Sequence, residues 1–159
     1  MGLDITAYKK LSKVENPKLD DDGYPENWQT EWKPGGGMIW SESCFPGRGE
    51  GVEPNTVYKY EDEFDFRAGS YSGYGWWRER LEEISDGNSF LELINFADNE
   101  GVIGSVVSKK LYNDFVSNAE LAEKYSKTIG EDGEYWFDKY NSWMKAFEMA
   151  MDDGAVNFH

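Results

Sequence analysis

"TVYKYEDEFDFRAGSYSGYGWWRERLEEI", residues 56–84, contains the change of period that predicts the fold. Over residues 56–69, β-branched and aromatic residues alternate with polar ones, which is typical of one long strand or a hairpin. Beyond Gly75, the residues Trp77, Leu81 and Ile84 follow at helical spacing with charged residues between them. We therefore expect the chain to change here from β structure to a short amphipathic helix.

The segments before this stretch predict strands and loops. In "LDITAYKKL", residues 3–11, apolar and polar residues alternate, which indicates a half-buried strand. Residues 20–37 are rich in Gly, Pro, Asn and Asp, so we expect a long loop with Trp28 and Trp32 folded back onto the body. Residues 37–43, "GMIWSES", are expected to form a short strand.

The segments after it predict helices. Residues 89–101 fit either a strand or a helical turn, and we favour the helix. Two further helices are expected, one that follows Ser105 as its N-cap and one over residues 118–128. The last helix begins near Gly133 and carries an apolar stripe that should pack on the sheet: Trp136, Tyr140, Trp143 and Phe147.

Strands that precede helices indicate an α+β fold. We expect a small antiparallel sheet, formed by the N-terminal half of the chain, to pack against the C-terminal helices. A chain of 159 residues is long enough to bury a core without disulfides or metals, and we expect a single domain over residues 1–159.

The chain is strongly acidic, with 31 acidic and 16 basic residues and a net charge of −15. Such a surface repels phosphate backbones and anionic membranes, so direct binding of nucleic acid is disfavoured and no membrane partner is expected. The acidity is either a means of solubility or a surface that imitates nucleic acid or docks on a basic partner protein. The N-terminus lacks the pattern of a secretory signal and Cys44 is the single cysteine, so we expect a cytoplasmic location.

Few side chains suited to catalysis are available. The only histidine is His159, the last residue, a position at which chains usually fray. Without a neighbouring histidine, Cys44 has no base to make it a thiolate. One cysteine and one histidine cannot close a zinc site, and the acidic runs lack the spacing of a calcium-binding loop. We therefore expect no cofactor, no metal and no catalytic residue.

Carboxylates gather in the predicted strand after residue 60. Glu61, Glu63 and Asp65 alternate along it and should project from one face. A solvated edge explains them, while a contiguous acidic band would instead bind a basic partner protein.

The stretch "RAGSYSGYGWWRER", residues 67–80, combines glycine, aromatic and basic residues. It fits either a structural turn whose rings fill the core or a pocket for a planar anion such as a nucleotide. In the pocket interpretation, Arg67 contacts the anion and the walls are Tyr71, Tyr74 and Trp76. In the alternative, Arg67 forms an internal ion pair with Asp65 or Asp98.

A second polar segment, "NFADNEGVIGSVVSKKL", covers residues 95–111. Ser105 lies where a helix is expected to begin, and free N–H groups there would suit an anion, although Ser105 itself can cap them. If the two segments meet in space, Arg67, Asn95, Asp98 and Ser105 form one polar cluster.

Three stretches resemble a group of small uncharacterised bacteriophage and prophage proteins: "MGLDITAY", "FDFRAGSYSGYGWWRERL" and "INFADNEGVIGSVVSKKLYNDF". The resemblance covers the first strand and roughly residues 60–115. It implies a phage protein made in bacterial cytoplasm and brings no activity. Members of this group often read "SDCEG" where this chain has "ADNEG", so the absent cysteine argues against redox or metal chemistry at Asn99.

Three functions remain open. The first is a non-enzymatic accessory protein with which a phage binds a host protein, such as a defence protein with a basic surface. The second is a nucleotide-binding protein that sequesters a signal in a pocket formed by residues 67–77. The third is an enzyme that acts through carboxylates, which requires acidic residues in a closed pocket.

Overall fold

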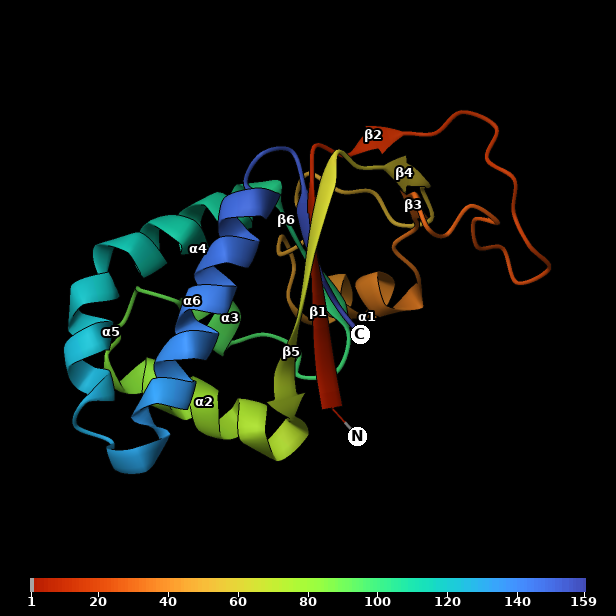
Figure 1. Cartoon of the computed structure of the whole chain (residues 1–159). Helices are drawn as coiled ribbons and strands as arrows, with labels where there is room; N and C mark the ends of the chain where they lie inside the picture. Colours follow the sequence, from red (N-terminus) through yellow and green to blue (C-terminus); the bar gives the residue numbers. More distant parts are fainter. Residues whose placement is uncertain (1) are drawn as a thin grey trace.

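The computed structural model describes residues 2–159 and has a four-stranded antiparallel sheet at its centre (Figure 1). The strands lie in the order β5-β1-β7-β6, with bounds β1 Gly2–Lys9, β5 Asp62–Ser70, β6 Gly101–Gly104 and β7 Ala155–Phe158. The predicted α+β class is confirmed. The sheet does not come from the N-terminal half alone, because β6 and β7 belong to the C-terminal half.

Helices cover one face of this sheet, which we call the inner face (Figure 1). They are α2 Tyr71–Glu83, α3 Leu91–Ile94, α4 Ser105–Ser117, α5 Ala119–Ser126 and α6 Gly133–Ala150, with a 3-10 turn, η1, at Gly130–Asp132. The sequence predicts four helices after α2, and α3, α4, α5 and α6 confirm their positions. The helix expected over residues 89–101 is only the single short turn of α3.

The aromatic stripe of α6 forms the centre of the core, as the sequence predicts. Trp136, Tyr140, Trp143 and Phe147 are completely buried. Phe66 of β5 meets the ring of Trp143 edge-on, with 5.1 Å between the ring centroids. Rings of this size supply much of the buried apolar area that stabilises a domain with few aliphatic residues.

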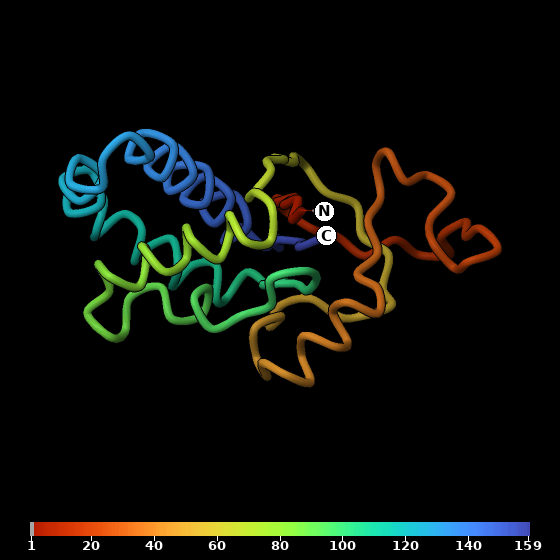
Figure 2. The backbone as a smooth tube through the Cα atoms, turned by 90° about the horizontal axis from the view of Figure 1, so that it is seen from below, coloured from red at the N-terminus to blue at the C-terminus, as the bar shows by residue number. Residues whose placement is uncertain are grey.

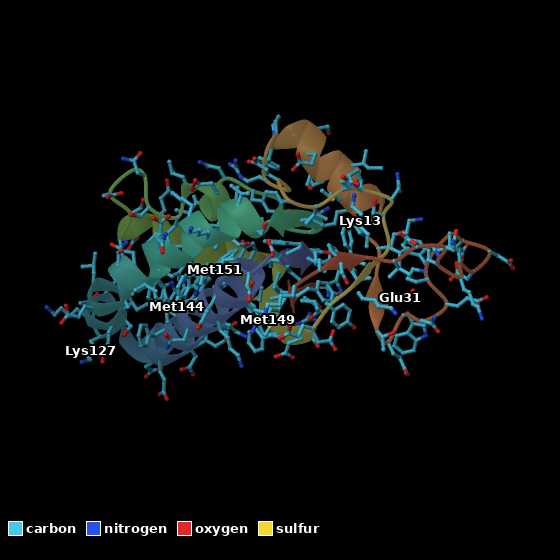
Figure 3. All side chains as sticks on the ribbon, turned by 90° about the horizontal axis from the view of Figure 1, so that it is seen from above. Lys13, Glu31, Lys127, Met144, Met149 and Met151 are labelled. Atoms are coloured by element: carbon cyan, nitrogen blue, oxygen red, sulfur yellow. The ribbon has the colours of Figure 1, made fainter. Side chains whose placement is uncertain are left out.

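The opposite, outer face of the sheet carries a smaller layer (Figure 2). It consists of α1 Gly36–Cys44 and a three-stranded sheet in the order β2-β4-β3, with bounds β2 Ser12–Lys13, β3 Glu31–Trp32 and β4 Tyr58–Lys59. Figure 3 shows the two layers from above, with Glu31 on this side of the sheet and Met144 and Met149 of α6 on the other.

Two predictions for this layer are wrong. Residues 37–43 lie in helix α1 instead of a strand, because Met38 and Ser41 are spaced by three residues and both face the interior. The alternating run 56–69 is also not one strand or one hairpin: β4 and β5 are separated at Tyr60 and Glu61 and belong to different sheets.

A second aromatic cluster fixes this layer to the outer face. The ring of Tyr8 on β1 lies 4.8 Å from Trp32 and 4.7 Å from Tyr60, between ring centroids. Trp32 is therefore folded back onto the body as predicted, whereas the prediction for Trp28 is wrong, since its side chain is 71% exposed.

Candidate functional site

Strand pairing gathers polar side chains at one end of the outer face. In the antiparallel pair β1–β5, Asp4 lies opposite Arg67 and Thr6 lies opposite Asp65. Residues that face each other across such a pair project from the same side of the sheet. Because Ile5, between Asp4 and Thr6, is completely buried on the inner face, these four polar side chains point outwards.

Thr6 links two of the neighbouring strands through its hydroxyl group. Its Oγ1 donates to Oδ1 of Asp65 at 2.7 Å and lies 2.9 Å from Nε2 of His159. A hydroxyl group has one proton, and Thr6 donates it to Asp65. In the contact with His159, Nε2 is therefore the donor and Thr6 Oγ1 the acceptor. Thr6 is only 6% exposed, whereas its two partners, Asp65 and His159, are exposed to solvent.

His159 is held in place, contrary to the prediction of a frayed end. Its backbone N–H donates to Asp4 O at 3.0 Å and its carbonyl accepts from Asp4 N at 2.9 Å. These two bonds continue the β1–β7 pairing by one residue. A histidine is therefore present at the outer face. No local pattern in the sequence indicates this, because β7 is short and directly follows the long helix α6.

Arg67 forms a cross-strand ion pair on this face. Its Nη1 lies 3.3 and 3.4 Å from the two carboxylate oxygens of Asp4. The guanidinium group crosses over Gly2, where an added Cβ would lie 1.9 Å from its Nη2. Neither Asp65 nor Asp98 is its partner, and both side chains of the Arg67–Asp4 pair are about half exposed.

Two cavities adjoin at His159. One, of about 420 Å³, is lined by Asp4, Thr6, Asp65 and Arg67. The other cavity has a volume of about 390 Å³. It is lined by Gly35 and Gly36 at the start of α1, by residues 99–101 and by Tyr24. His159 lines both, so the two cavities are neighbours on the outer face, and we refer to the pair as the polar groove.

The aromatic walls predicted for an Arg67 pocket lie elsewhere. Helix α2 begins at Tyr71 directly after β5, with Ser70 Oγ accepting from Gly73 N at 3.0 Å as the N-cap. This start turns Tyr74 into the core, where it is completely buried and stacks on Trp143 at 5.6 Å. The stretch is therefore the end of β5 and the first ten residues of α2, which begins earlier than the sequence predicts.

The other two predicted wall residues do not surround Arg67 either. Tyr71 is 40% exposed at the start of α2. Trp76 is half-buried and stacks under the guanidinium group of Arg80, which lies 4.8 Å from its ring centroid. No hydrogen bond, ion pair or cavity lining joins Arg67 to either residue within 2–159.

The second polar segment meets α2 through a different arginine. Arg78 donates to Phe96 O at 2.9 Å, and Asn95 lines a cavity of about 260 Å³ with Arg78. Asp98 is exposed beside this contact. The two segments therefore do meet, but without Arg67.

Ser105 lies apart from that contact. It is the first residue of α4, and the N-cap is Gly104, which offers no side chain. The hydroxyl group of Ser105 faces Gly51 in a separate cavity of about 440 Å³. The predicted cluster of Arg67, Asn95, Asp98 and Ser105 is therefore not formed.

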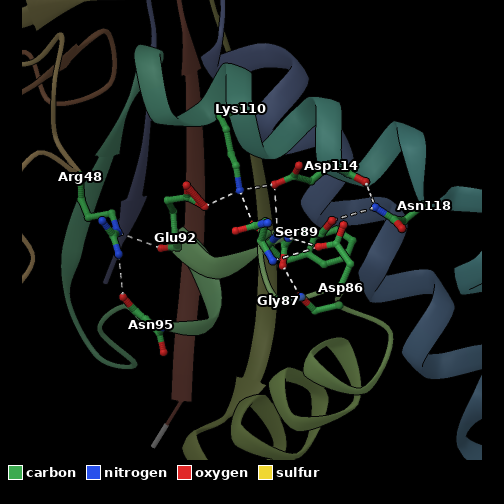
Figure 4. Close-up of polar contacts among 12 residues, drawn as sticks. Arg48, Asp86, Gly87, Ser89, Glu92, Asn95, Lys110, Asp114 and Asn118 are labelled. Atoms are coloured by element: carbon green, nitrogen blue, oxygen red, sulfur yellow. Dashed lines mark hydrogen bonds and ion pairs between the residues drawn. The ribbon is translucent and has the colours of Figure 1, made fainter.

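A polar network that no sequence pattern indicates holds the loop before α3 (Figure 4). Lys110 Nζ donates to Glu92 Oε1 at 2.7 Å and to Asn88 O at 2.6 Å, and lies 2.7 Å from Asp114 Oδ2. Although burial opposes its charge, the bonds to Asp114 and Glu92 raise the pKa of Lys110. Asp114 also accepts from Phe90 N at 3.0 Å, so the network clamps a loop rather than lining a site.

The three predicted partner-binding carboxylates are exposed at the edge of the sheet. Glu63 and Asp65 project from the outer face of β5, and Glu61 precedes the strand. Glu61 lies 3.9 and 3.6 Å from the amino groups of Lys9 and Lys10. Within residues 2–159, neither Glu63 nor Asp65 has a basic group within 4.0 Å.

The carboxylate-enzyme interpretation required acidic residues in a closed pocket. The six carboxylates on which it would rest are all exposed instead: Glu61, Asp62, Glu63, Asp65, Asp98 and Glu100.

Comparison with protein-family models, curated proteins and solved structures finds no match to this chain. Among residues 2–159, none of the helices combines the length and the apolar character needed to cross a bilayer.

Proposed function

We propose that the protein acts by binding a partner protein with a basic surface, and that Glu61, Glu63 and Asp65, here called the acidic edge, contact that partner. The observation that carries the proposal is the exposure of these three carboxylates: Glu63 and Asp65 lie on β5, the edge strand of the main sheet, and Glu61 directly precedes it. Charged side chains on an edge strand discourage pairing with another strand. A partner would therefore contact the side chains of this strand rather than its backbone.

The charges of this edge are available to a partner. Glu63 and Asp65 have no cationic neighbour within 4.0 Å in residues 2–159, whereas Asp4 on the adjacent strand is paired with Arg67. A net charge of −15 adds long-range attraction for a basic surface, which speeds encounter and weakens with salt. The resemblance of three sequence stretches to phage and prophage proteins supports a host protein, such as a defence protein of the bacterial cytoplasm, as the partner.

The test reverses the acidic edge to lysine in a triple variant, Glu61→Lys, Glu63→Lys and Asp65→Lys. The matched control makes the same change in charge on the helical side with Glu120→Lys, Glu123→Lys and Glu131→Lys, which are also exposed. Proteins captured from a bacterial lysate are quantified by mass spectrometry at 50 and 300 mM salt. We expect one basic protein to be lost with the first variant and with salt, and kept with the control.

Equal capture by the two triple variants would contradict the proposal. It would reduce the acidity to a means of solubility. Circular dichroism of each variant checks that the fold is intact.

The polar groove supports a second candidate, binding of a small anionic ligand. Its cavity of about 420 Å³ places Arg67 and His159 beside the buried hydroxyl group of Thr6. The stacking face predicted from Tyr74 is absent, so recognition would rest on charge and hydrogen bonds. A thermal-shift screen with nucleotides and other small anions, followed by native mass spectrometry, tests it. An unshifted melting temperature with every compound would contradict it.

A further inference from the structure

Residues 15–30, which we call the arm, project from the outer layer away from the sheet (Figures 1 and 2). Three large apolar side chains of the arm are exposed: Trp28 by 71%, Tyr24 by 47% and Leu19 by 44%. By contrast, Trp77, Trp136 and Trp143 are at most 1% exposed. Several exposed apolar side chains on one projecting segment favour an interaction surface, because they lose contact with water only in a complex.

The arm is ordered by its own hydrogen bonds. Asp20 Oδ1 accepts from Asp22 N and from Tyr24 N, both at 2.9 Å, and closes a tight turn. Glu26 N donates to Lys18 O at 2.8 Å, beside an antiparallel bridge between Leu19 and Pro25. The projecting side chains are thus attached to a defined backbone.

The base of the arm is fixed to the body. Lys33 Nζ donates to Gly23 O at 2.5 Å, and Tyr60 Oη donates to Gln29 O at 2.9 Å. Tyr60 in turn packs on Tyr8 of the main sheet. A preorganised element loses little conformational entropy on binding, so more of its contact energy appears as affinity.

The charge of the arm selects the partner. Residues 15–30 contain five acidic residues and one lysine, and three of the acids, Asp20 to Asp22, are consecutive. An acidic segment that carries an exposed tryptophan is repelled by anionic lipid and by nucleic acid. It complements a protein surface in which lysine and arginine surround an apolar pocket.

We propose that the arm is a docking element and that Trp28 is its anchor, which inserts into an apolar pocket framed by basic residues on a partner protein. The inference rests on the proposed partner-binding function, but it uses residues separate from the acidic edge. Tyr24 connects the two, since it lies on the arm and also lines the polar groove on the outer face. The docking surface therefore extends from the arm across the groove towards β5.

The test is a selection that can be made before the natural partner is identified. A naive library of displayed binding domains is selected on the full chain, and the affinity of each clone is measured for wild type, Trp28→Ala and Trp40→Ala. Trp40 is a matched control because it is an exposed tryptophan, by 41%, on α1 outside the arm. We expect most clones to weaken about thirtyfold or more with Trp28→Ala, as for an interface hot spot, and to be unaffected by Trp40→Ala.

Sequencing of the clones provides a second readout, since their randomised positions should be enriched in lysine and arginine. Clones that bind Trp28→Ala as tightly as wild type would overturn the inference. If such clones nevertheless lose binding to the triple lysine variant of the acidic edge, the proposed function stands without the arm.

A bilayer is the other surface that takes up exposed tryptophan. Co-sedimentation with vesicles of 70% phosphatidylcholine and 30% phosphatidylglycerol is therefore measured for wild type and Trp28→Ala. We expect neither to sediment. Sedimentation of the wild type that Trp28→Ala abolishes would overturn the protein partner in favour of lipid.

Discussion

Trp77 and Trp136 exchange two hydrogen bonds across the core. The indole N–H of Trp77 donates to Trp136 O at 3.0 Å, and that of Trp136 donates to Trp77 O at 3.2 Å. Their rings are nearly parallel, with an interplanar angle of 28°. This reciprocal pair joins α2 to the first turns of α6 and satisfies two buried donors that would otherwise destabilise the core.

Replacing Trp77 with phenylalanine should therefore cost more than the same change at Trp143. Both rings are buried in one stack, 5.8 Å apart, but Trp143 Nε1 has no hydrogen-bond partner within residues 2–159. Trp77→Phe removes the bond to Trp136 O, a carbonyl that keeps its partner within helix α6, so we expect a difference of about 0.5–1.5 kcal/mol in the free energy of unfolding. Urea denaturation of the two variants measures it, and equal losses would contradict the bonding.

Truncation of Trp143 tests the packing of α6 on the sheet. Trp143 is completely buried and contacts Phe66 of β5 and Phe158 of β7. Trp143→Ala should lower the free energy of unfolding by about 3–5 kcal/mol, the range for a large core aromatic. The exposed Trp40 serves as control in the same urea experiment. A loss below about 1 kcal/mol at Trp143 would mean that the helix does not pack in this way.

The sequence predicts elements whose side-chain period is set by one buried face. The stripe on α6 repeats over about three helical turns, and the alternation in β1 separates Leu3 and Ile5 from Asp4 and Thr6. It does not predict elements whose burial depends on distant partners. β7 is a short strand that pairs with β1 on one side and with β6 on the other, and α1 is a short helix packed on only one side.

The candidate site is only partly predictable for the same reason. The outward direction of Glu63, Asp65 and Arg67 follows from the period of one strand. Their neighbours Asp4 and His159 come from the two ends of the chain and depend on the sheet order, which no local pattern gives. The hydrophobicity of Trp28 favours a place on the body, whereas its side chain is 71% exposed in the structure.

Glycines 69 and 75, which look alike in the sequence, should respond oppositely to alanine. Gly69 has a φ of +131°, a conformation that side chains rarely adopt, and it ends the strand before α2. Gly75 lies inside α2, with open space where a Cβ would project. We expect Gly69→Ala to destabilise the fold and Gly75→Ala to stabilise it by about 0.5–1 kcal/mol. Melting temperatures of the two variants would refute this assignment if both moved in the same direction.

Removal of Arg67 should leave the fold almost unchanged. Its ion pair with Asp4 is about half exposed and competes with water, so we expect Arg67→Ala to lower the free energy of unfolding by less than about 1 kcal/mol. If the polar groove binds an anion, the same variant lowers affinity for any compound found in the thermal-shift screen. A large loss of stability with unchanged binding would instead make Arg67 a structural residue. Lys139→Ala is a useful comparison, because Lys139 Nζ donates to the carbonyl of Arg67 without entering the groove.

Stability should fall at alkaline pH because of buried tyrosines, and Tyr74 offers the clearest test. Burial raises the pKa of Tyr74 above its ordinary value near 10, with the nearby Arg78 opposing the shift. The unfolded chain loses this proton near pH 10 while the folded chain keeps it. The contribution is therefore complete below pH 10 and is lost as the pH rises, by up to about 1.4 kcal/mol per pH unit.

The hydroxyl group of Tyr74 is buried and has no hydrogen-bond partner within residues 2–159. Tyr74→Phe should consequently leave stability at pH 7 unchanged or slightly higher, because an unsatisfied polar group is removed. Above pH 10 the free energy of unfolding of Tyr74→Phe should decline less steeply with pH than that of the wild type. Urea midpoints at pH 7, 10 and 11 measure both effects, with Tyr135→Phe, at an exposed position, as the control. Parallel declines for wild type and Tyr74→Phe would show that Tyr74 ionises in the folded chain as readily as in the unfolded one.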